Sequence, residues 1–333
     1  MVLYADVAGE RTRVGTVVWS MFLVAVMAAI APAHFEARAD LFAAAFLLVR
    51  ATAARGALST GKLLVSWPLL QFGGLATPWI VAMWVPTPWK FVLWAVGLVF
   101  DLVLVIVRPE RDPSELVQRL RRRTRGHERV RGPEKQPDLQ VVDVDASHLD
   151  ERLGLFVIIV LGEAVSQLVV PAATTEWSRA PEQAAIAGFV ILAGLWWLTF
   201  SYGFTTAPHT RLASLRPRFA LPLHLLTTFG IVCLAAGLGE MASHPEETIG
   251  VELRWVMCAG LALHFAVTGV SGLAAGAPRR WLLGWALPVT VVPLLLAAVG
   301  ASLSNGRLTL GLLLCVGWMV GYGRLSHRRA AST

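Results

Sequence analysis

Ten apolar stretches, each about 20 residues long, constrain the fold of this 333-residue chain more than any other feature. A helix of that length crosses the roughly 30 Å of hydrocarbon in a bilayer. A backbone exposed to lipid must satisfy its own hydrogen bonds, and such stretches are too long for barrel strands. We therefore expect an all-α, multi-pass membrane protein rather than a soluble domain. The predicted spans are 14–33, 39–58, 63–84, 88–107, 153–172, 184–203, 219–240, 252–274, 281–300 and 307–325.

Basic residues are distributed unevenly between the two sides that ten alternating helices would create. The odd-numbered connecting segments, with the two chain ends among them, hold 24 of the 29 Lys and Arg residues, and the even-numbered segments hold 5. Segments rich in Lys and Arg remain on the cytoplasmic side of a membrane. We therefore predict ten helices with both termini in the cytoplasm.

The longest polar segment, residues 108–152, separates an N-terminal membrane half, 1–107, from a C-terminal half, 153–333. Its first part is basic, with seven Arg between positions 119 and 131, and its second part is acidic. We expect residues 108–135 to lie against anionic lipid headgroups, unless they form only an ordinary cytoplasmic loop. No interleaved aromatic residues or nucleic-acid-binding fold accompany the basic run, so we expect no nucleic-acid partner.

Ionisable residues within the predicted spans are the candidates for function. A charged group at the centre of a membrane costs about 2.5 to 3.5 kcal/mol on insertion scales, so it usually has a functional or pairing role. Both roles stay open, because an ion pair that only locks helices together would satisfy the same residues. The candidate intramembrane polar site consists of Arg50, Asp101, Glu163, His224 and His264.

Two of these residues are predicted to lie at one depth. Glu163 follows Arg152 by eleven residues and His264 follows Arg254 by ten, which places each about 15 to 17 Å from its side of the membrane. We interpret Glu163 and His264 as a pair able to exchange a proton near neutral pH. Arg50 is a competing partner for Glu163. With such a pair, Glu163→Gln would abolish pH-dependent transport.

No motif indicates a cofactor or a metal. The three cysteines lie in apolar stretches without metal-ligand spacing. Gly56 to Lys62 matches most of a phosphate-binding loop, but Leu63 replaces the Ser or Thr that binds magnesium. We therefore expect no cofactor. Glycine pairs at 272 and 276 and at 317 and 321 favour close helix packing.

The stretch H-L-D-E-R-L-G-L-F-V-I-I-V-L-G-E, residues 148–163, resembles the signature of the bacterial low temperature requirement A family. A second stretch, residues 221–240, is similar to a family segment with a His and a terminal Glu. The resemblance implies a polytopic protein of the bacterial cytoplasmic membrane, linked by the family name to growth in the cold, without an established chemistry. Its motif residues here are His148, Glu151, Arg152, Gly162 and Glu163.

The beginning of the chain departs from the family pattern. Members typically open with a helix resembling E-L-F-F-D-L-V-F-V and a second span, and neither precedes the first helix here. Residues 1–13 resemble the loop that follows this hairpin. We expect the first family hairpin to be missing, with a vacant groove beside the first two helices.

Three functions fit these features. The preferred one is a transporter or permeation protein for an ion, a proton or a small solute. The alternatives are a membrane-embedded enzyme that uses Glu163 and His264 as acid and base, and a cold-related sensor or scaffold. Enzymatic activity is the less favoured expectation, and the sequence leaves the substrate and the oligomeric state open.

Overall fold

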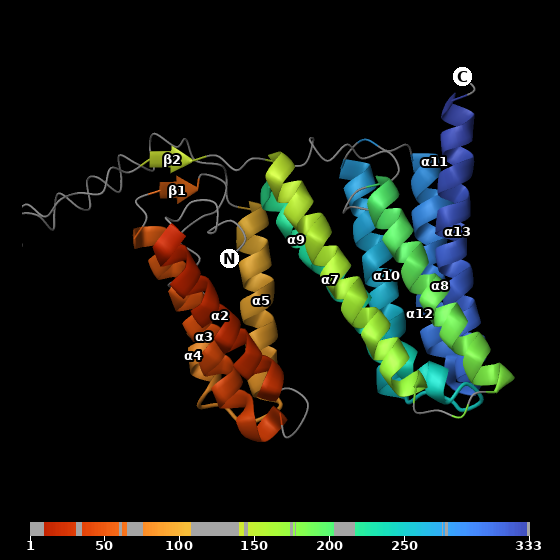
Figure 1. Cartoon of the computed structure of the whole chain (residues 1–333), viewed down its shortest axis with the longest axis horizontal. Coiled ribbons are helices and arrows are strands. Elements are labelled where there is room, and N and C mark those ends of the chain that lie inside the picture. Colours follow the sequence, from red (N-terminus) through yellow and green to blue (C-terminus); the bar gives the residue numbers. More distant parts are fainter. Residues whose placement is uncertain are drawn as a thin grey trace, which may run out of the picture. The chain divides into compact units, whose positions relative to one another are not determined.

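The computed structural model describes residues 10–30, 35–59, 62–64, 76–107, 140–142, 146–173, 176, 178–202, 217–274, 276 and 279–331. The chain forms two compact units, Met1–Asp145 and Ala146–Thr333. The division between the units falls within the predicted polar loop. Figure 1 shows long helices in both units.

The first unit contains four described helices: α2 (Glu10–Ile30), α3 (Phe35–Ser59), α4 (Thr77–Ala82) and α5 (Trp89–Val107). Strands β1 (Lys62–Leu64) and β2 (Gln140–Val142) pair in parallel, with Lys62 opposite Gln140. Stacked aromatic rings form the core between α3, α4 and α5. The Trp79 ring lies 4.0 Å from Phe46 and 5.0 Å from Trp94, centroid to centroid.

The described residues of the second unit form six helical rods. They are α7 (Ala146–Ala172), α8 (Arg179–Tyr202), α9 (Pro217–Ser243), α10 (Val251–Ala274), a composite rod and α13 (Asn305–Ala331). The composite rod joins α11 (Arg279–Trp281), the π-turn η4 (Leu282–Ala286), α12 (Leu287–Val299) and the 3-10 turn η5 (Gly300–Ser302). Within the described residues, six helices are long and apolar enough to cross a membrane, and all six belong to this unit.

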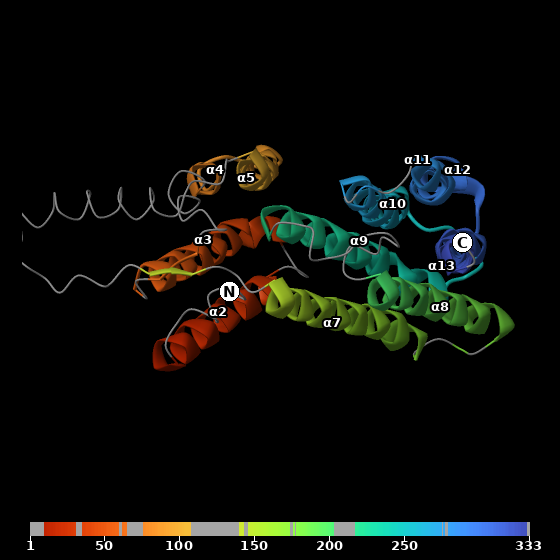
Figure 2. The same ribbon diagram turned by 90° about the horizontal axis from the view of Figure 1, so that it is seen from above.

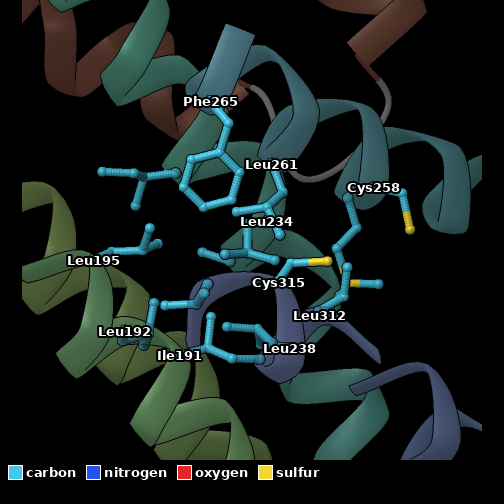
Figure 3. Packing of buried hydrophobic residues seen from close by; sticks show 14 of the residues in the cluster. Ile191, Leu192, Leu195, Leu234, Leu238, Cys258, Leu261, Phe265, Leu312 and Cys315 are labelled. Carbon is cyan, nitrogen blue, oxygen red and sulfur yellow. The ribbon is translucent and has the colours of Figure 1, made fainter. Parts of the chain in front are cut away.

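The six rods close into a ring around one core. Going around the ring, α7 packs against α9, α9 against α10, α10 against α12, α12 against α13, α13 against α8, and α8 against α7. Figure 2 shows α9 between α7 and α10. The apolar residues labelled in Figure 3 fill the interior: Ile191, Leu192, Leu195, Leu234, Leu238, Cys258, Leu261, Phe265, Leu312 and Cys315.

A tryptophan compensates for a proline in the composite rod. Pro288 has no N–H to bond the carbonyl of Gly284 four residues earlier. The indole Nε1 of Trp318 on α13 donates a hydrogen bond to that carbonyl at 3.0 Å. A freed carbonyl is costly in lipid unless it finds another donor. This contact therefore helps to hold α13 against the composite rod.

Most predicted spans coincide with helices, which confirms the expectation of a helical membrane protein. The exception is the third span, 63–84, where the described residues form only the end of β1 and the short helix α4. The predicted headgroup contact, 108–135, lies outside the described residues. Of the segment 1–13 behind the missing-hairpin prediction, residues 1–9 also lie outside them, and residues 10–13 belong to α2. The total of ten spans stays a prediction.

Candidate functional site

A row of buried polar side chains lies along α9 and α10 in the interior of the second unit. All six are at most 5% exposed, although most of the other residues of both helices are apolar. We name this row the polar seam. It consists of His224, Thr227 and Thr228 on α9 and His264, Thr268 and Ser271 on α10.

Two glycines bring α9 and α10 into backbone contact beside the seam. A Cβ added to Gly230 would lie 2.5 Å from the carbonyl oxygen of Gly260. A Cβ added to Gly260 would lie 2.3 Å from the Cβ of Cys233. Only glycine permits this approach. His264, one turn after Gly260, is thereby pressed against α9.

The ring of His264 has one satisfied and one unsatisfied nitrogen. Its Nδ1 lies 3.0 Å from the carbonyl oxygen of Thr227. Because a carbonyl can only accept, Nδ1 must carry the hydrogen. In the neutral ring, Nε2 then carries no hydrogen and can only accept a hydrogen bond or a proton. This nitrogen is sealed from solvent, the residue is 1% exposed, and Nε2 has no hydrogen-bond partner among the described residues.

The hydroxyl groups of the seam all donate to their own helices. Thr227 and Thr228 donate to the carbonyl of His224 at 2.9 and 2.8 Å. Thr268 donates to the carbonyl of His264 at 2.9 Å, and Ser271 to that of Val267 at 2.8 Å. These bonds occupy the hydroxyl hydrogens, so each hydroxyl can interact further only as an acceptor. The seam therefore presents acceptors to any proton-bearing species.

His224 lies toward α7. Its ring is 5.7 Å from that of Phe156, centroid to centroid, and the residue is buried. The seam thus continues from the α9–α10 contact, at His264, to the α7–α9 contact, at His224. Two of the five predicted intramembrane residues therefore belong to one buried feature.

Arg50 and Asp101 form an ion pair in the first unit. The guanidinium of Arg50 donates to both carboxylate oxygens of Asp101, the longer contact being 3.3 Å. A second ion pair, which sequence reasoning missed, joins Lys90 to Asp40. The partners of the two pairs are separated by nearly the same number of residues along the chain, 51 and 50. This similar spacing was the sequence feature that could have indicated both pairs. Both pairs connect α3 with α5.

Glu163 lies elsewhere, and the predicted pair with His264 is not formed. Glu163 is exposed on α7 and accepts a hydrogen bond from Nε2 of Gln167 at 2.8 Å. The prediction paired the two residues by their equal depth, which requires that their helices be neighbours. Instead, α9 packs between α7, which carries Glu163, and α10, which carries His264. The Gly230–Gly260 crossing also turns His264 toward α9. The competing partner for Glu163, Arg50, is paired with Asp101.

The remaining motif residues lie on α7. Glu151 is exposed and Arg152 is half-buried. A Cβ added to Gly162 would meet no atom within 4 Å. The side chain of His148 lies outside the described residues. The motif therefore marks the beginning and the exposed face of α7 rather than the polar seam.

Sequence reasoning missed the hydroxyl residues of the seam. The recurrence of polar residues at 264, 268 and 271 places them on one face of a helix, and the adjacent Thr227 and Thr228 follow His224 closely. That spacing was the available indication. Among the described residues, no group of three or more His, Cys, Asp or Glu side chains could hold a metal ion.

Six helices that are long and apolar enough to cross a membrane, packed around one core, define a multi-pass helical membrane protein. The family model of the bacterial low temperature requirement A protein (LtrA) matches residues 2–320. The chain therefore belongs to this family, as the motif at 148–163 indicated. No curated protein and no solved structure shows a significant match to the chain.

Proposed function

We propose that this protein is a transporter that moves protons, alone or together with a small solute, through its six-helix second unit. One observation carries the proposal: His264 is fully buried in that unit, and its Nε2 has no partner among the described residues. A histidine is the side chain whose charge changes near neutral pH. An ionisable residue inside a membrane protein is a functional candidate by default.

The distribution of polarity along α9 and α10 supports access from one end. From the Gly230–Gly260 crossing, the seam extends toward the end of the unit where α9 begins and α10 ends. His224 is six residues from Gly230, a rise of about 9 Å. In the opposite direction, apolar residues such as Leu238 and Met257 adjoin the crossing, and the buried polar residues Arg254, Asn305 and Thr309 lie nearer the far end. A polar half that apolar packing separates from the far end fits a gated transporter better than an open pore.

The orientation of the protein belongs to the same proposal. The predicted topology puts the polar half of the seam on the cytoplasmic side of the bacterial cytoplasmic membrane. The two ion pairs of the first unit support alternating crossings, because Asp40 precedes Arg50 on α3 just as Lys90 precedes Asp101 on α5. The two helices therefore run in the same direction. The ten-span topology requires this, because its second and fourth spans cross the membrane in the same direction.

Proton flux in liposomes tests the proposal. The purified chain is reconstituted with a pH-sensitive dye inside, and an imposed proton gradient should collapse faster than in empty liposomes. His264→Gln removes the titratable nitrogen and should reduce the flux to the background. Thr199→Val is the matched control, because Thr199 is a buried hydroxyl residue on α8 that bonds its own helix outside the seam.

Two results would contradict the proposal. One is a wild-type flux no greater than that of empty liposomes, which would favour the sensor or scaffold alternative. The other is an undiminished flux in His264→Gln. The enzyme alternative needs an acid beside the histidine, and Glu163 does not supply it, because its hydrogen bond goes to Gln167.

A further inference from the structure

Arg254 is a buried cation at the end of the second unit opposite the polar half of the seam. It lies in the first turn of α10 and is 6% exposed. Its Nε donates to the carbonyl oxygen of Ala297 near the end of α12, at 2.9 Å. Gly300 leaves room for the side chain, since a Cβ there would lie 3.2 Å from Cδ of Arg254.

The charge of Arg254 is only partly compensated. A guanidinium stays protonated inside proteins, and a buried charge is costly without a counter-charge. The carboxyl end of α12 supplies about half of a negative charge. Among the described residues, no carboxylate forms an ion pair with Arg254, although Glu246, Glu247 and Glu252 are close in sequence; all three are exposed.

The other end of the guanidinium is open. Both Nη nitrogens donate no hydrogen bond within the described residues, yet neither belongs to the polar atoms sealed from the surface. The Nε contact holds the planar group in place. A fixed guanidinium with two free nitrogens presents parallel donors that match two oxygens of an oxyanion.

We propose that Arg254 is the cationic centre of a binding site for a phosphate group. The site is independent of proton movement through the seam. A phosphate satisfies the free donors and compensates the remaining charge. Its source is either the headgroup of a membrane lipid or a soluble phosphate.

The surroundings of Arg254 are held by fixed contacts. The backbone N–H of Asn305 donates to the carbonyl of Glu247 at 2.7 Å, and its side-chain Nδ2 donates to that of His244, also at 2.7 Å. The N–H of Gly306 donates to the carbonyl of Pro245 at 2.8 Å. These bonds join the α9–α10 connection to the start of α13. Arg254 lies within about one helical turn of this end, a depth at which lipid headgroups are within reach.

Thermal unfolding of the full chain in neutral detergent tests the site. Phosphatidylglycerol and inorganic phosphate are titrated separately, and diacylglycerol with the same acyl chains is the control for the apolar part of the lipid. We expect saturable stabilisation of the wild type by phosphatidylglycerol but not by diacylglycerol if the source is lipid. Saturable stabilisation by inorganic phosphate identifies a soluble source. Either result supports the site if it depends on Arg254.

Two variants establish that dependence. Arg254→Gln removes the charge and should abolish the saturable shift. Arg254→Lys keeps the charge and a donor for the Ala297 carbonyl, so this variant should still fold. It lacks the two parallel Nη donors of the guanidinium, so the apparent affinity for the phosphate group should fall by roughly tenfold. Arg307→Gln changes an exposed arginine in the first turn of α13 and should bind as the wild type does. No saturable shift in the wild type, or equal affinity in Arg254→Lys and the wild type, would overturn the proposal.

Discussion

At the scale of single residues, the sequence predicted which ionisable groups lie within helices better than it predicted their partners. Hydropathy identifies a charged residue inside an apolar stretch, as it did for Arg50, Asp101 and His264. The partner depends on the direction in which each side chain points around its helix. That direction is fixed by contacts such as the Gly230–Gly260 crossing, which have no local pattern.

The first residue-scale prediction concerns Glu163. Replacement of Glu163 with Gln should leave proton flux close to that of the wild type, because the carboxylate lies on the exposed face of α7 and bonds Gln167 rather than the seam. Flux in liposomes, measured beside His264→Gln, checks this expectation. A loss of flux equal to that of His264→Gln would show that Glu163 belongs to the proton path after all.

The ion pair between Arg50 and Asp101 allows a second residue-scale prediction. Asp101→Asn leaves a partly buried guanidinium without its counter-charge and should lower the free energy of unfolding by about 1 to 3 kcal/mol. The residual solvent exposure of both side chains keeps the loss below that of a fully buried pair. Thermal unfolding in detergent measures the effect.

A double-mutant cycle isolates the pair. If Arg50→Gln and Asp101→Asn act on the same contact, the double variant should be hardly less stable than either single variant. Additive losses would mean that the two residues stabilise the first unit independently.

At the scale of elements, the length and apolar composition of each stretch predicted most of the helices, because a membrane span is specified by its own composition. The bounds of α9 and α10 contain those predicted from apolar character. The contacts between helices were predicted less well. Gly272 packs against Trp281, but its predicted companion Gly276 lies beyond the end of α10, and Cβ atoms at Gly276, Gly317 and Gly321 would meet nothing within 4 Å. Spacing alone cannot distinguish a contact from an exposed face.

The crossing of α9 and α10 gives a prediction at this scale. Gly260→Ala places a methyl group 2.3 Å from the Cβ of Cys233. The two helices must then move apart, or the backbone at the crossing must distort. We expect a loss of stability of about 1 to 3 kcal/mol. Proton flux should fall as well, because the hydrogen bond from Nδ1 of His264 to the carbonyl of Thr227 would lengthen or break.

Gly321→Ala is the matched control for that variant. This glycine is also in a long helix, but its Cβ position is open. The substitution should therefore be neutral or stabilising, by up to about 1 kcal/mol, because alanine favours the helix. Equal losses from the two variants in thermal unfolding would mean that helix propensity, rather than the close crossing, determines the effect.

At the scale of the whole molecule, topology follows from charge rather than from packing. The distribution of Lys and Arg predicts that residues 108–152 face the cytoplasm, and the α9–α10 connection then faces outward. Packing within the second unit is compatible with either orientation of that unit, since a bundle of helices can be inverted without changing its contacts. The orientation therefore has to be tested directly.

Cysteine labelling in intact cells tests the orientation. In a background with Cys233, Cys258 and Cys315 replaced by Ala, a new cysteine is introduced at Thr124 or at Thr248. Thr248 lies exposed in the α9–α10 connection. An impermeant maleimide should modify Thr248→Cys from outside, whereas Thr124→Cys should react only after the cells are opened. The reverse pattern would show that the protein has the opposite orientation. The polar half of the seam would then lie outside, and Arg254 would lie on the cytoplasmic side. Labelling of both positions from outside would require an even number of crossings between them, instead of the three that the predicted spans give, and the alternating arrangement of spans would then be wrong.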